Sequence, residues 1–349
     1  MKLIVITQKA DINDGNLGFF HRWLENLARK TDELRVVCLS EGEHHLPQNV
    51  KVYSLGKKRG YSKIRQFFRL QKFLLANLNE ADGVFAHMCP IYAILSFPLV
   101  KIFKKRMILW YMHKSVNLKL KLAEKCVDKI LTASKESCRL KNRKKIEIVG
   151  HGIDTDLFEP KETAEEGIFN ILCTGRISKI KDQETLIRAA DILINGKNFK
   201  DIKVKFIGSA LDWSEKEYFL KLKEIVEKLG LEDFVEFLGG LPYIKLPSYY
   251  QNADLSVNLS QTGSLDKVTL EAMASGCLVL TCNEAFSGIL DEKYLFKEKD
   301  PDDLAQKIIG LKDASADDNL RKIVINGHNL DNLTDKIILK FNHDQIIGR

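Results

Sequence analysis

Short apolar runs alternate with longer amphipathic stretches along almost the whole chain of 349 residues, and this alternation is the feature that most constrains the fold. The runs carry Val, Ile and Leu at consecutive positions, which is typical of strands buried on both faces of a parallel sheet. Regular strand–helix alternation predicts an α/β class with right-handed crossovers. The strands expected in the first half are 3–6, 35–39, 51–54, 83–86, 107–112 and 129–132, with helices over 17–30 and 64–78.

The pattern restarts after a polar stretch that contains a proline, residues 159–162. The strands expected in the second half are 170–174, 204–207, 235–238, 255–258 and 278–281, with helices over 183–194, 215–229 and 265–275. We therefore predict two Rossmann-like domains facing a cleft, over 1–160 and 161–330. A C-terminal helix over 331–349 is expected to pack back toward the first domain. Ligands of open α/β sheets bind at the carboxyl ends of the strands, so functional residues are expected there.

Charge is divided unequally between the two halves. Residues 1–150 hold 29 Lys and Arg against 13 Asp and Glu, whereas residues 151–349 hold 25 against 34, which gives the net +7 of the chain. Such asymmetry indicates a polyanionic or membrane-surface partner for the first half, the alternative being a solvated basic surface. Nucleic acid is not expected as the partner, because no recognised binding motif and no interleaved aromatic residues accompany the basic clusters.

No apolar stretch reaches the roughly 20 residues of a membrane span. The longest, Pro90–Val100, is interrupted by Pro98, and the run Leu3–Ile6 is too short for the core of a signal peptide. The seven cysteines are odd in number and have no CxxC spacing, which argues against a disulfide framework and a structural zinc site. We expect a cytoplasmic protein, peripheral on the inner membrane face if its basic half meets anionic lipid.

The first motif is the loop Thr174–Asp182, which follows an expected strand and precedes an expected helix. Gly175 permits a turn at the strand end. The fork of Arg176 and the point charge of Lys181 together suit a diphosphate. The alternative is a pair of solvated loop cations.

The second motif is Thr262–Gly276. Ser264 is a good N-cap and Gly276 a good residue just after a helix, so we expect a helix over 265–275. The free N–H groups at the start of such a helix form an anion site. Glu271 lies one turn after Lys267, and the two readings are a surface ion pair or a carboxylate that accepts ribose hydroxyls.

Weaker signals come from the first half. His113 lies just past the strand expected over 107–112, where site residues gather. Gly15 and Asn16 belong to the loop Asp14–Gly18, whose glycines let backbone approach a ligand, although the loop is neither GxGxxG nor a Walker motif. The acidic pattern Asp154-Thr155-Asp156 lies beside the expected linker, and we expect no metal there.

Five segments in order along the chain resemble the retaining glycosyltransferases of family 4, which have the GT-B fold. They are Gly150–Phe158, Gly175-Arg176 with Lys181, Phe237–Gly239, Tyr249–Asp254 and Leu270–Gly276. The resemblance implies that 161–330 binds a nucleotide-sugar donor, linked to UDP or GDP, and that 1–160 is the acceptor-side domain. It implies no cofactor, no bound metal and retention of anomeric configuration.

The resemblance also implies roles for individual residues. Arg176 and Lys181 would bind the donor diphosphate and act in catalysis with His113, which would contact the transferred sugar. Glu271 would hold the ribose. The turn at Gly239, Gly240 and Leu241 would meet the base through its backbone. The donor-binding set is completed by Gly15, Asn16, Gly175, Gly208, Thr262, Gly263, Ser264, Leu265 and Lys267.

One departure from the family pattern concerns its paired glutamates, which stand eight positions apart. The second matches Glu271, but the first falls on Gly263. The family glutamate contacts the transferred sugar, so the sugar is not predicted, and Asp266 and Lys267 are candidates for substitute contacts. Two alternatives stay open: a nucleotide-sugar 2-epimerase of the same architecture, and a partner subunit that binds a nucleotide-sugar without transfer. The expected acceptor is a sugar or a lipid-linked sugar in cell-envelope polysaccharide synthesis.

Overall fold

The computed structural model describes residues 1–160, 167–261 and 263–342. The chain forms two compact units, each of which is described by itself. Unit 1 comprises Met1–Gly152 and the chain from Asn329, and unit 2 comprises Ile153–His328. The first boundary between the units follows Gly152, eight residues before the predicted boundary at residue 160. The second boundary follows His328, two residues before the predicted boundary at residue 330, and the chain after it belongs to unit 1.

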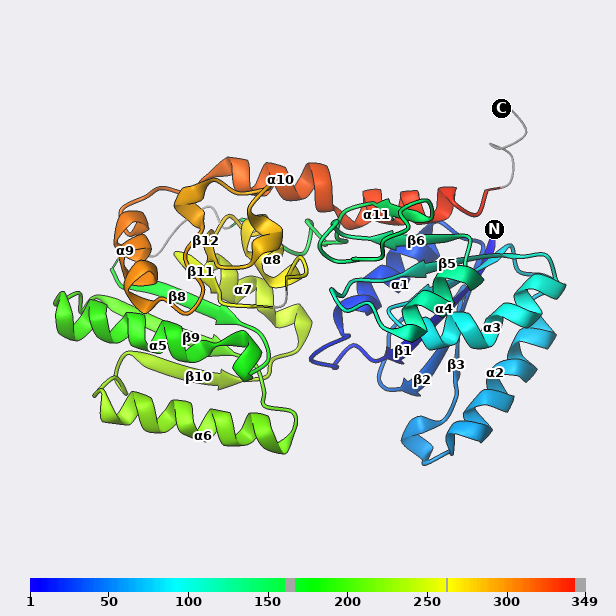
Figure 1. Cartoon of the computed structure of the whole chain (residues 1–349), viewed down its shortest axis with the longest axis horizontal. Helices are drawn as coiled ribbons and strands as arrows, with labels where there is room; N and C mark the ends of the chain where they lie inside the picture. The colour runs from blue at the N-terminus through cyan, green and yellow to red at the C-terminus, as the bar shows by residue number, and fades with distance from the viewer. Residues whose placement is uncertain (161–166, 262, 343–349) are drawn as a thin grey trace. The chain divides into compact units, whose positions relative to one another are not determined.

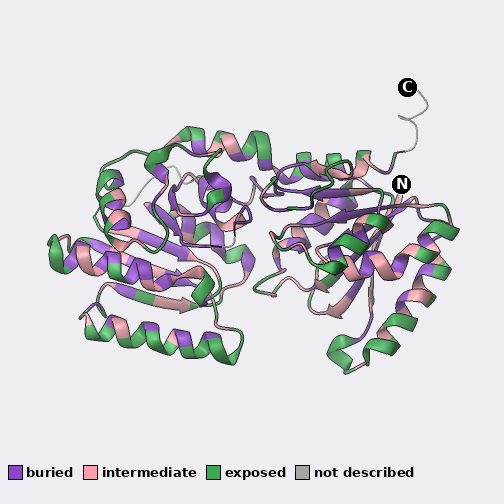
Figure 2. Cartoon of the chain, viewed as in Figure 1, coloured by how far each residue is buried: buried purple, intermediate pink, exposed green. Residues whose placement is uncertain are grey.

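Unit 1 is built on a parallel sheet of order β3-β2-β1-β4-β5-β6-β7 (Figure 1). Its strands are β1 (Lys2–Ala10), β2 (Glu33–Glu41), β3 (Val50–Ser54), β4 (Gly83–His87), β5 (Arg106–Trp110), β6 (Lys129–Thr132) and β7 (Ile146–Ile148). The central strands β1 and β4 have completely buried runs (Figure 2), which explains their unbroken apolar sequence. The six strands predicted for this half are present, and β7 is an additional short edge strand.

The helices of unit 1 are α1 (Phe19–Arg29), α2 (Lys63–Asn77), α3 (Pro90–Ile102), α4 (Leu118–Cys126) and α11 (Leu330–Leu339). Leu70 of α2, Ala93 of α3 and Leu120 of α4 belong to one apolar core on one face of the sheet. The C-terminal helix α11 packs against α1, where Lys30 lies 2.6 Å from Asp335. The predicted helix over 331–349 is therefore shorter, and residues 343–349 lie outside the described residues.

Unit 2 has a parallel sheet of order β10-β9-β8-β11-β12. Its strands are β8 (Phe169–Thr174), β9 (Ile202–Ile207), β10 (Val235–Gly239), β11 (Leu255–Asn258) and β12 (Leu278–Thr281). Its helices are α5 (Gln183–Asp191), α6 (Trp213–Lys228), α7 (Leu246–Gln251), α8 (Lys267–Ala274), α9 (Pro301–Leu311) and α10 (Asp318–His328). The five strands predicted here are present. Both sheets with their alternating helices confirm the predicted α/β class.

The helix predicted over 265–275 begins two residues later than expected. The N-cap of α8 is Asp266, so the prediction that Ser264 is the cap is wrong. The reason is packing: the side chain of Leu265 is fully buried, and the carbonyl of Ser264 accepts a hydrogen bond of 2.7 Å from Asn283 Nδ2. Gly276 has a φ of 79°, which confirms its predicted place as the left-handed residue after the helix.

Candidate functional site

The two sequence motifs of unit 2 lie at the point where the strand order reverses. From β8 the chain runs outward through β9 to β10, and then returns to the other side of β8 as β11 and β12. The loop with Arg176 and Lys181 follows β8, and the loop that leads into α8 follows β11. Crevices at such reversal points are the usual ligand sites of open α/β sheets, so the topology brings both motifs to one place.

Glycines line the carboxyl ends of three neighbouring strands. Gly175 follows β8 with a φ of 145°, and Gly208 follows β9 with a φ of 155°. A Cβ on Gly208 would lie 1.9 Å from the carbonyl oxygen of Gly175, and a Cβ on Gly240 would lie 2.4 Å from Ser209 Oγ. The three loops are therefore stacked closely because they lack side chains at these positions. Leu241, the next predicted residue, is half-buried.

Lys181 reaches from the first motif to the second. Its Nζ donates to Ser260 Oγ at 2.9 Å and lies 3.2 Å from both carboxylate oxygens of Asp266. Asp266 Oδ2 also accepts from the side-chain amides of Asn258 and Asn283, each at 3.3 Å. Three strand ends thus converge on one carboxylate, which fixes the lysine ammonium beside the N-terminus of α8.

Arg176 has a carboxylate partner as well. Its Nε lies 3.1 Å from Glu215 Oε1 in the first turn of α6, and 44% of its side chain is exposed. The loop behind it is held by Gln183, whose amide donates to the Arg176 carbonyl at 3.0 Å and accepts from the N–H of Ser178. Sequence reasoning missed Glu215 and Gln183, because neither lies in a motif and both are brought to the loop only by folding.

Glu271 is buried in the middle of α8. It has no exposed surface, and its Oε1 lies 2.8 Å from Lys267 Nζ. Lys267 Nζ lies 4.6 Å from the ring centroid of Tyr243. Burial, the charge of Glu271 and a side-chain hydrogen bond with Glu271 raise the pKa of Tyr243 well above its ordinary value. Within the described residues, Glu271 Oε2 has no hydrogen-bond partner. The reading of Lys267 and Glu271 as a surface ion pair is therefore wrong.

Asp182 stands where the resembling family has glycine, and the structure explains the family's preference. Its φ of 48° lies in the left-handed region, which glycine and, less often, aspartate adopt. Asp182 Oδ2 accepts from Thr185 Oγ1 at 2.8 Å and from Gln261 Nε2 at 3.3 Å, while burial raises the pKa of its carboxyl group. These hydrogen bonds help to hold Asp182 in the left-handed conformation that the loop requires.

The remaining predicted residues of unit 2 belong to the loop before α8. Gly263 has a φ of 60° and is buried, as are the side chains of Ser264 and Leu265. A donor could meet Leu265 only through its backbone, because its side chain is in the core. Thr262 lies outside the described residues.

The predicted residues of unit 1 lie on two loops at the carboxyl edge of its sheet. Asp14 Oδ1 accepts from the N–H of Asn16 at 3.1 Å and of Leu17 at 2.7 Å, and Gly15 has open space around its Cα. Burial alone would raise the pKa of Asp14, but Lys9 and these N–H groups lower it. His113 is exposed, and its Nδ1 accepts from the N–H of Ser115 at 3.0 Å.

A second histidine at this edge was missed by sequence reasoning. His87 ends β4, is 1% exposed, and stacks on Phe20 with ring centroids 3.7 Å apart. Its Nδ1 lies 3.2 Å from Thr7 Oγ1. Burial lowers the pKa of His87 to about 3, so the ring is neutral at ordinary pH. Its position directly after the strand predicted over 83–86 was the signal that could have found it.

Within the described residues, no group of three or more His, Cys, Asp or Glu side chains is arranged to hold a metal ion. Asp154 of the acidic pattern accepts the N–H of Leu157 at 3.1 Å, and all seven cysteines are free thiols.

Comparison with known proteins places unit 2 in a family. The profile of the family described as glycosyl transferases group 1 matches residues 154–329, which is just over half of the chain and coincides closely with unit 2. The D-inositol 3-phosphate glycosyltransferase of Paenarthrobacter aurescens is 29% identical over 147 residues, which are 40% of this chain and 35% of that protein. The mannosylfructose-phosphate synthase of Agrobacterium fabrum is 31% identical over 143 residues, 38% of this chain and 32% of that protein. The matched region thus spans about a third of the length of these relatives.

Solved structures resemble the chain over almost its whole length. Anabaena HepE in complex with UDP has a TM-score of 0.78 at 17% identity and covers 97% of this chain and 99% of its own. Sucrose-phosphate synthase from Thermosynechococcus elongatus has a TM-score of 0.75 at 15% identity and covers 98% of each chain. At these identities the likeness shows the fold, which is the GT-B class of two Rossmann-like domains. The family match and the fold agree, and this chain therefore belongs to the glycosyl transferases group 1 family.

Proposed function

We propose that the protein is a retaining glycosyltransferase that moves a sugar from a UDP- or GDP-linked donor to an acceptor hydroxyl without a bound metal. The relatives and structures named above are transferases and synthases, and HepE is described in complex with UDP. None of these names supports the epimerase alternative. The proposal places the donor at the carboxyl edge of unit 2.

The observation that carries the proposal is the free oxygen of Glu271. A buried carboxylate oxygen without a hydrogen bond costs about 1–3 kcal/mol or more, so folded proteins rarely leave one unless a ligand supplies the donor. Among the residues that the structure describes, Glu271 Oε2 finds no donor, and its neighbour Oε1 is held by Lys267. A ribose, with two adjacent hydroxyl groups, offers the donors that this position lacks.

The diphosphate is assigned to Arg176 and Lys181. Both cations now face carboxylates, Glu215 and Asp266. A phosphate oxygen makes the same kind of charge-assisted hydrogen bond as a carboxylate oxygen, so a donor can replace or share these partners without moving the cations far. The N–H groups at the start of α8 add donors for the same anion.

The chemical step follows from these contacts. The bond between the sugar and the diphosphate breaks while the acceptor hydroxyl attacks the same face, and negative charge grows on the departing phosphate. The acceptor oxygen forms the new glycosidic bond, and its proton passes to the departing diphosphate, which leaves as the nucleoside diphosphate. Preorganised donors aimed at growing charge typically contribute about 2.7–4 kcal/mol each. Arg176 and Lys181 would supply this stabilisation, which divalent metals supply in other sugar transferases.

The acceptor is proposed to be a sugar or a lipid-linked sugar in cell-envelope polysaccharide synthesis. The support is the excess of basic residues in the first half of the chain, which suits an anionic acceptor or an anionic lipid surface. A cytoplasmic location and contacts of Gly15, Asn16 and His113 with donor or sugar stay predictions.

Product analysis with a panel of UDP- and GDP-sugars tests the proposal. We expect donor cleavage with release of the nucleoside diphosphate, and transfer when an acceptor sugar is added. Lys181→Ala should lower donor turnover about a hundredfold, since one preorganised donor to the phosphate is lost. The matched control is Lys221→Ala, which removes a surface lysine paired 2.9 Å from Glu184. Conversion of the donor into an epimer, or no turnover of any donor by the folded protein, would overturn the proposal.

A further inference from the structure

Between Lys57 and Ala123 the chain has 14 Lys and Arg but only two acidic residues, Glu80 and Asp82. Both of these have partners: Glu80 lies 2.5 Å from Arg35, and Asp82 accepts the backbone N–H of Lys2 at 2.7 Å. This segment supplies α2, α3 and most of α4 of unit 1. The segment therefore carries a large excess of cationic over acidic residues in its sequence.

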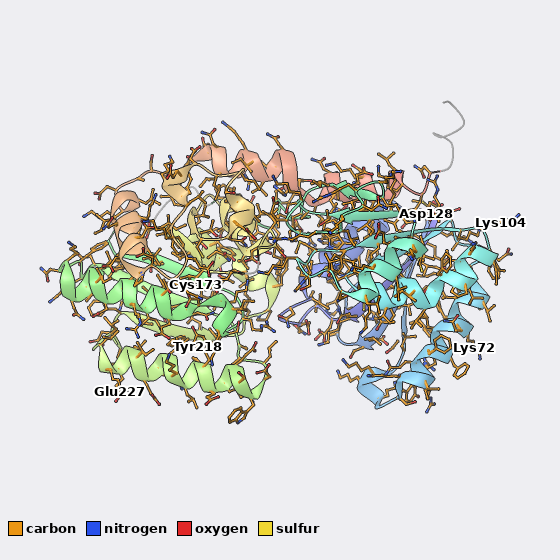
Figure 3. All side chains as sticks on the ribbon, viewed as in Figure 1. Lys72, Lys104, Asp128, Cys173, Tyr218 and Glu227 are labelled. Carbon is orange, nitrogen blue, oxygen red and sulfur yellow. The ribbon has the colours of Figure 1, made fainter. Side chains whose placement is uncertain are left out.

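The three helices cover the same face of the unit 1 sheet, in the order α2, α3, α4 (Figure 1). Their outer side, which we call the α2–α4 face, exposes large apolar side chains. These are Ile64, Phe67, Phe68, Leu75, Ile102, Leu118 and Leu122. Lys72 on α2 and Lys104 beyond the end of α3, both labelled in Figure 3, are exposed as well.

Helix α2 is apolar on two sides. Leu70 and Leu74 are buried in the core, as expected for a surface helix. Ile64, Phe68 and Leu75 form a second stripe, because their spacing of four and seven residues places them on one side of a helix. Ile64 is 70% exposed and Phe68 is 64% exposed. The second stripe is therefore left without a partner in unit 1.

Cations flank this apolar stripe. Lys57, Lys58 and Arg59 form a basic turn just before α2, and Lys72 lies on its exposed side. The guanidinium of Arg65 lies 3.6 Å from the centroid of the Tyr61 ring, which holds it at the surface. Exposed apolar side chains bordered by basic ones are the composition of protein surfaces that lie in the headgroup region of a bilayer.

We propose that the α2–α4 face binds the surface of an anionic lipid bilayer. Nucleic acid would account for the cations but not for exposed isoleucine, leucine and phenylalanine, whereas an anionic bilayer accounts for both. Within the described residues, no helix combines the length and apolar character required to traverse a bilayer, so the contact is peripheral. The inference deepens the proposed function by naming the surface that meets a lipid-linked acceptor.

Vesicle flotation with the full chain tests the inference independently of turnover. The probes are vesicles of phosphatidylcholine alone and of phosphatidylcholine containing about one third phosphatidylglycerol, at low and high salt. We expect binding only to the anionic vesicles, with weakening at high salt. Reversal of three exposed lysines, Lys58→Glu with Lys72→Glu and Lys119→Glu, should lower binding on the order of a hundredfold. Ile64→Ser with Phe68→Ser should lower it about tenfold.

The matched controls are on α6 of unit 2, where Lys216 and Leu220 are exposed. Lys216→Glu and Leu220→Ser should leave vesicle binding unchanged. Equal binding to both kinds of vesicle, or equal loss in control and test variants, would overturn the proposal. Charge reversal that weakens binding while Ile64→Ser with Phe68→Ser has no effect would also overturn it, because the surface would then recognise only a polyanion. Since donor hydrolysis is measured separately, a failure here leaves the donor site untouched.

Discussion

The carboxyl edges of the two sheets are built differently. At the edge of unit 2, Arg176 and Lys181 are held by carboxylates, and Glu271 is buried with one oxygen that has no hydrogen-bond partner in the described part of the chain. At the edge of unit 1, Gly15 has open space around it and His113 is exposed. An edge whose polar groups are fixed by packing can bind an anion with little rearrangement. We propose that unit 2 carries a preformed donor site, whereas unit 1 offers loops and, on another face, basic helices.

Among the changes that test this difference between the two edges, Arg176→Ala is expected to have the largest effect on donor turnover. Because the guanidinium would stabilise the charge that grows on the departing phosphate, we expect kcat/KM for the donor to fall a hundredfold or more, in line with about 2.7–4 kcal/mol for one such group. Steady-state kinetics measures it. Arg188→Ala is the matched control, since Arg188 also pairs with a glutamate but lies 51% exposed on α5. A loss under about threefold would remove Arg176 from the proposed mechanism.

The buried histidine of unit 1 predicts a pH effect on stability. The pKa of His87 is lowered by burial from 6.5 to about 3, so between these values the unfolded chain binds one proton more than the folded chain. The free energy of unfolding should therefore fall as pH drops, by about 2 kcal/mol from about pH 7 to about pH 5 for this group. Urea unfolding followed by the fluorescence of Trp23 and Trp110, both buried in unit 1, measures it.

His87→Asn should remove that part of the pH dependence, whereas His45→Asn, at an exposed histidine, should not. If both variants kept the wild-type dependence, His87 would not be the buried neutral group that the structure shows. The edge of unit 1 would then be less tightly packed around His87 than the structure indicates.

A smaller effect is expected for Asp266→Ala. Asp266 holds Lys181 and accepts from Asn258 and Asn283, so its removal should let the ammonium move away from the start of α8. We expect kcat/KM for the donor to fall about tenfold, since one charge-assisted contact is lost. Asp313→Ala, at an exposed aspartate, is the control. Unchanged kinetics would mean that the edge of unit 2 is less preformed than proposed.

The smallest effect concerns metal removal. Because Arg176 and Lys181 are proposed to neutralise the departing phosphate, prior treatment with a chelator should leave turnover unchanged within about twofold. Donor hydrolysis with and without added magnesium measures it. If the chelator lowered turnover tenfold or more and magnesium restored it, the cations of the chain alone would not neutralise the departing phosphate.

The sequence predicted the strands well and the details of the site less well. Buried strands such as β1 and β5 contain continuous apolar runs, so local pattern and tertiary environment agree. The start of α8 was predicted wrongly because Leu265 packs in the core and Asn283, which is distant in sequence, holds the preceding carbonyl. Glu215 could not be assigned to Arg176 from spacing, because their contact depends on how β8 and α6 are placed by the fold.

The order of motifs along the chain predicted the family, which the match over 154–329 confirms. The sequence did not predict the burial of Glu271, since an i,i+4 pair with Lys267 is also typical of a solvated helix surface. Burial depends on Tyr243 and on the neighbouring elements, which pattern alone does not place. The roles of individual residues therefore stay predictions that depend on measurement.

Calorimetric titration of the protein with UDP and with GDP tests the central claim most directly. If Glu271 Oε2 accepts ribose hydroxyls, Glu271→Gln should weaken binding of the preferred nucleotide about tenfold or more, because a charge-assisted hydrogen bond is lost. Glu227→Gln, at an exposed glutamate of α6, should leave the Kd unchanged (Figure 3). Equal affinity of wild type and Glu271→Gln, with the fold of the variant verified, would contradict the assignment of the donor site to the buried carboxylate of unit 2.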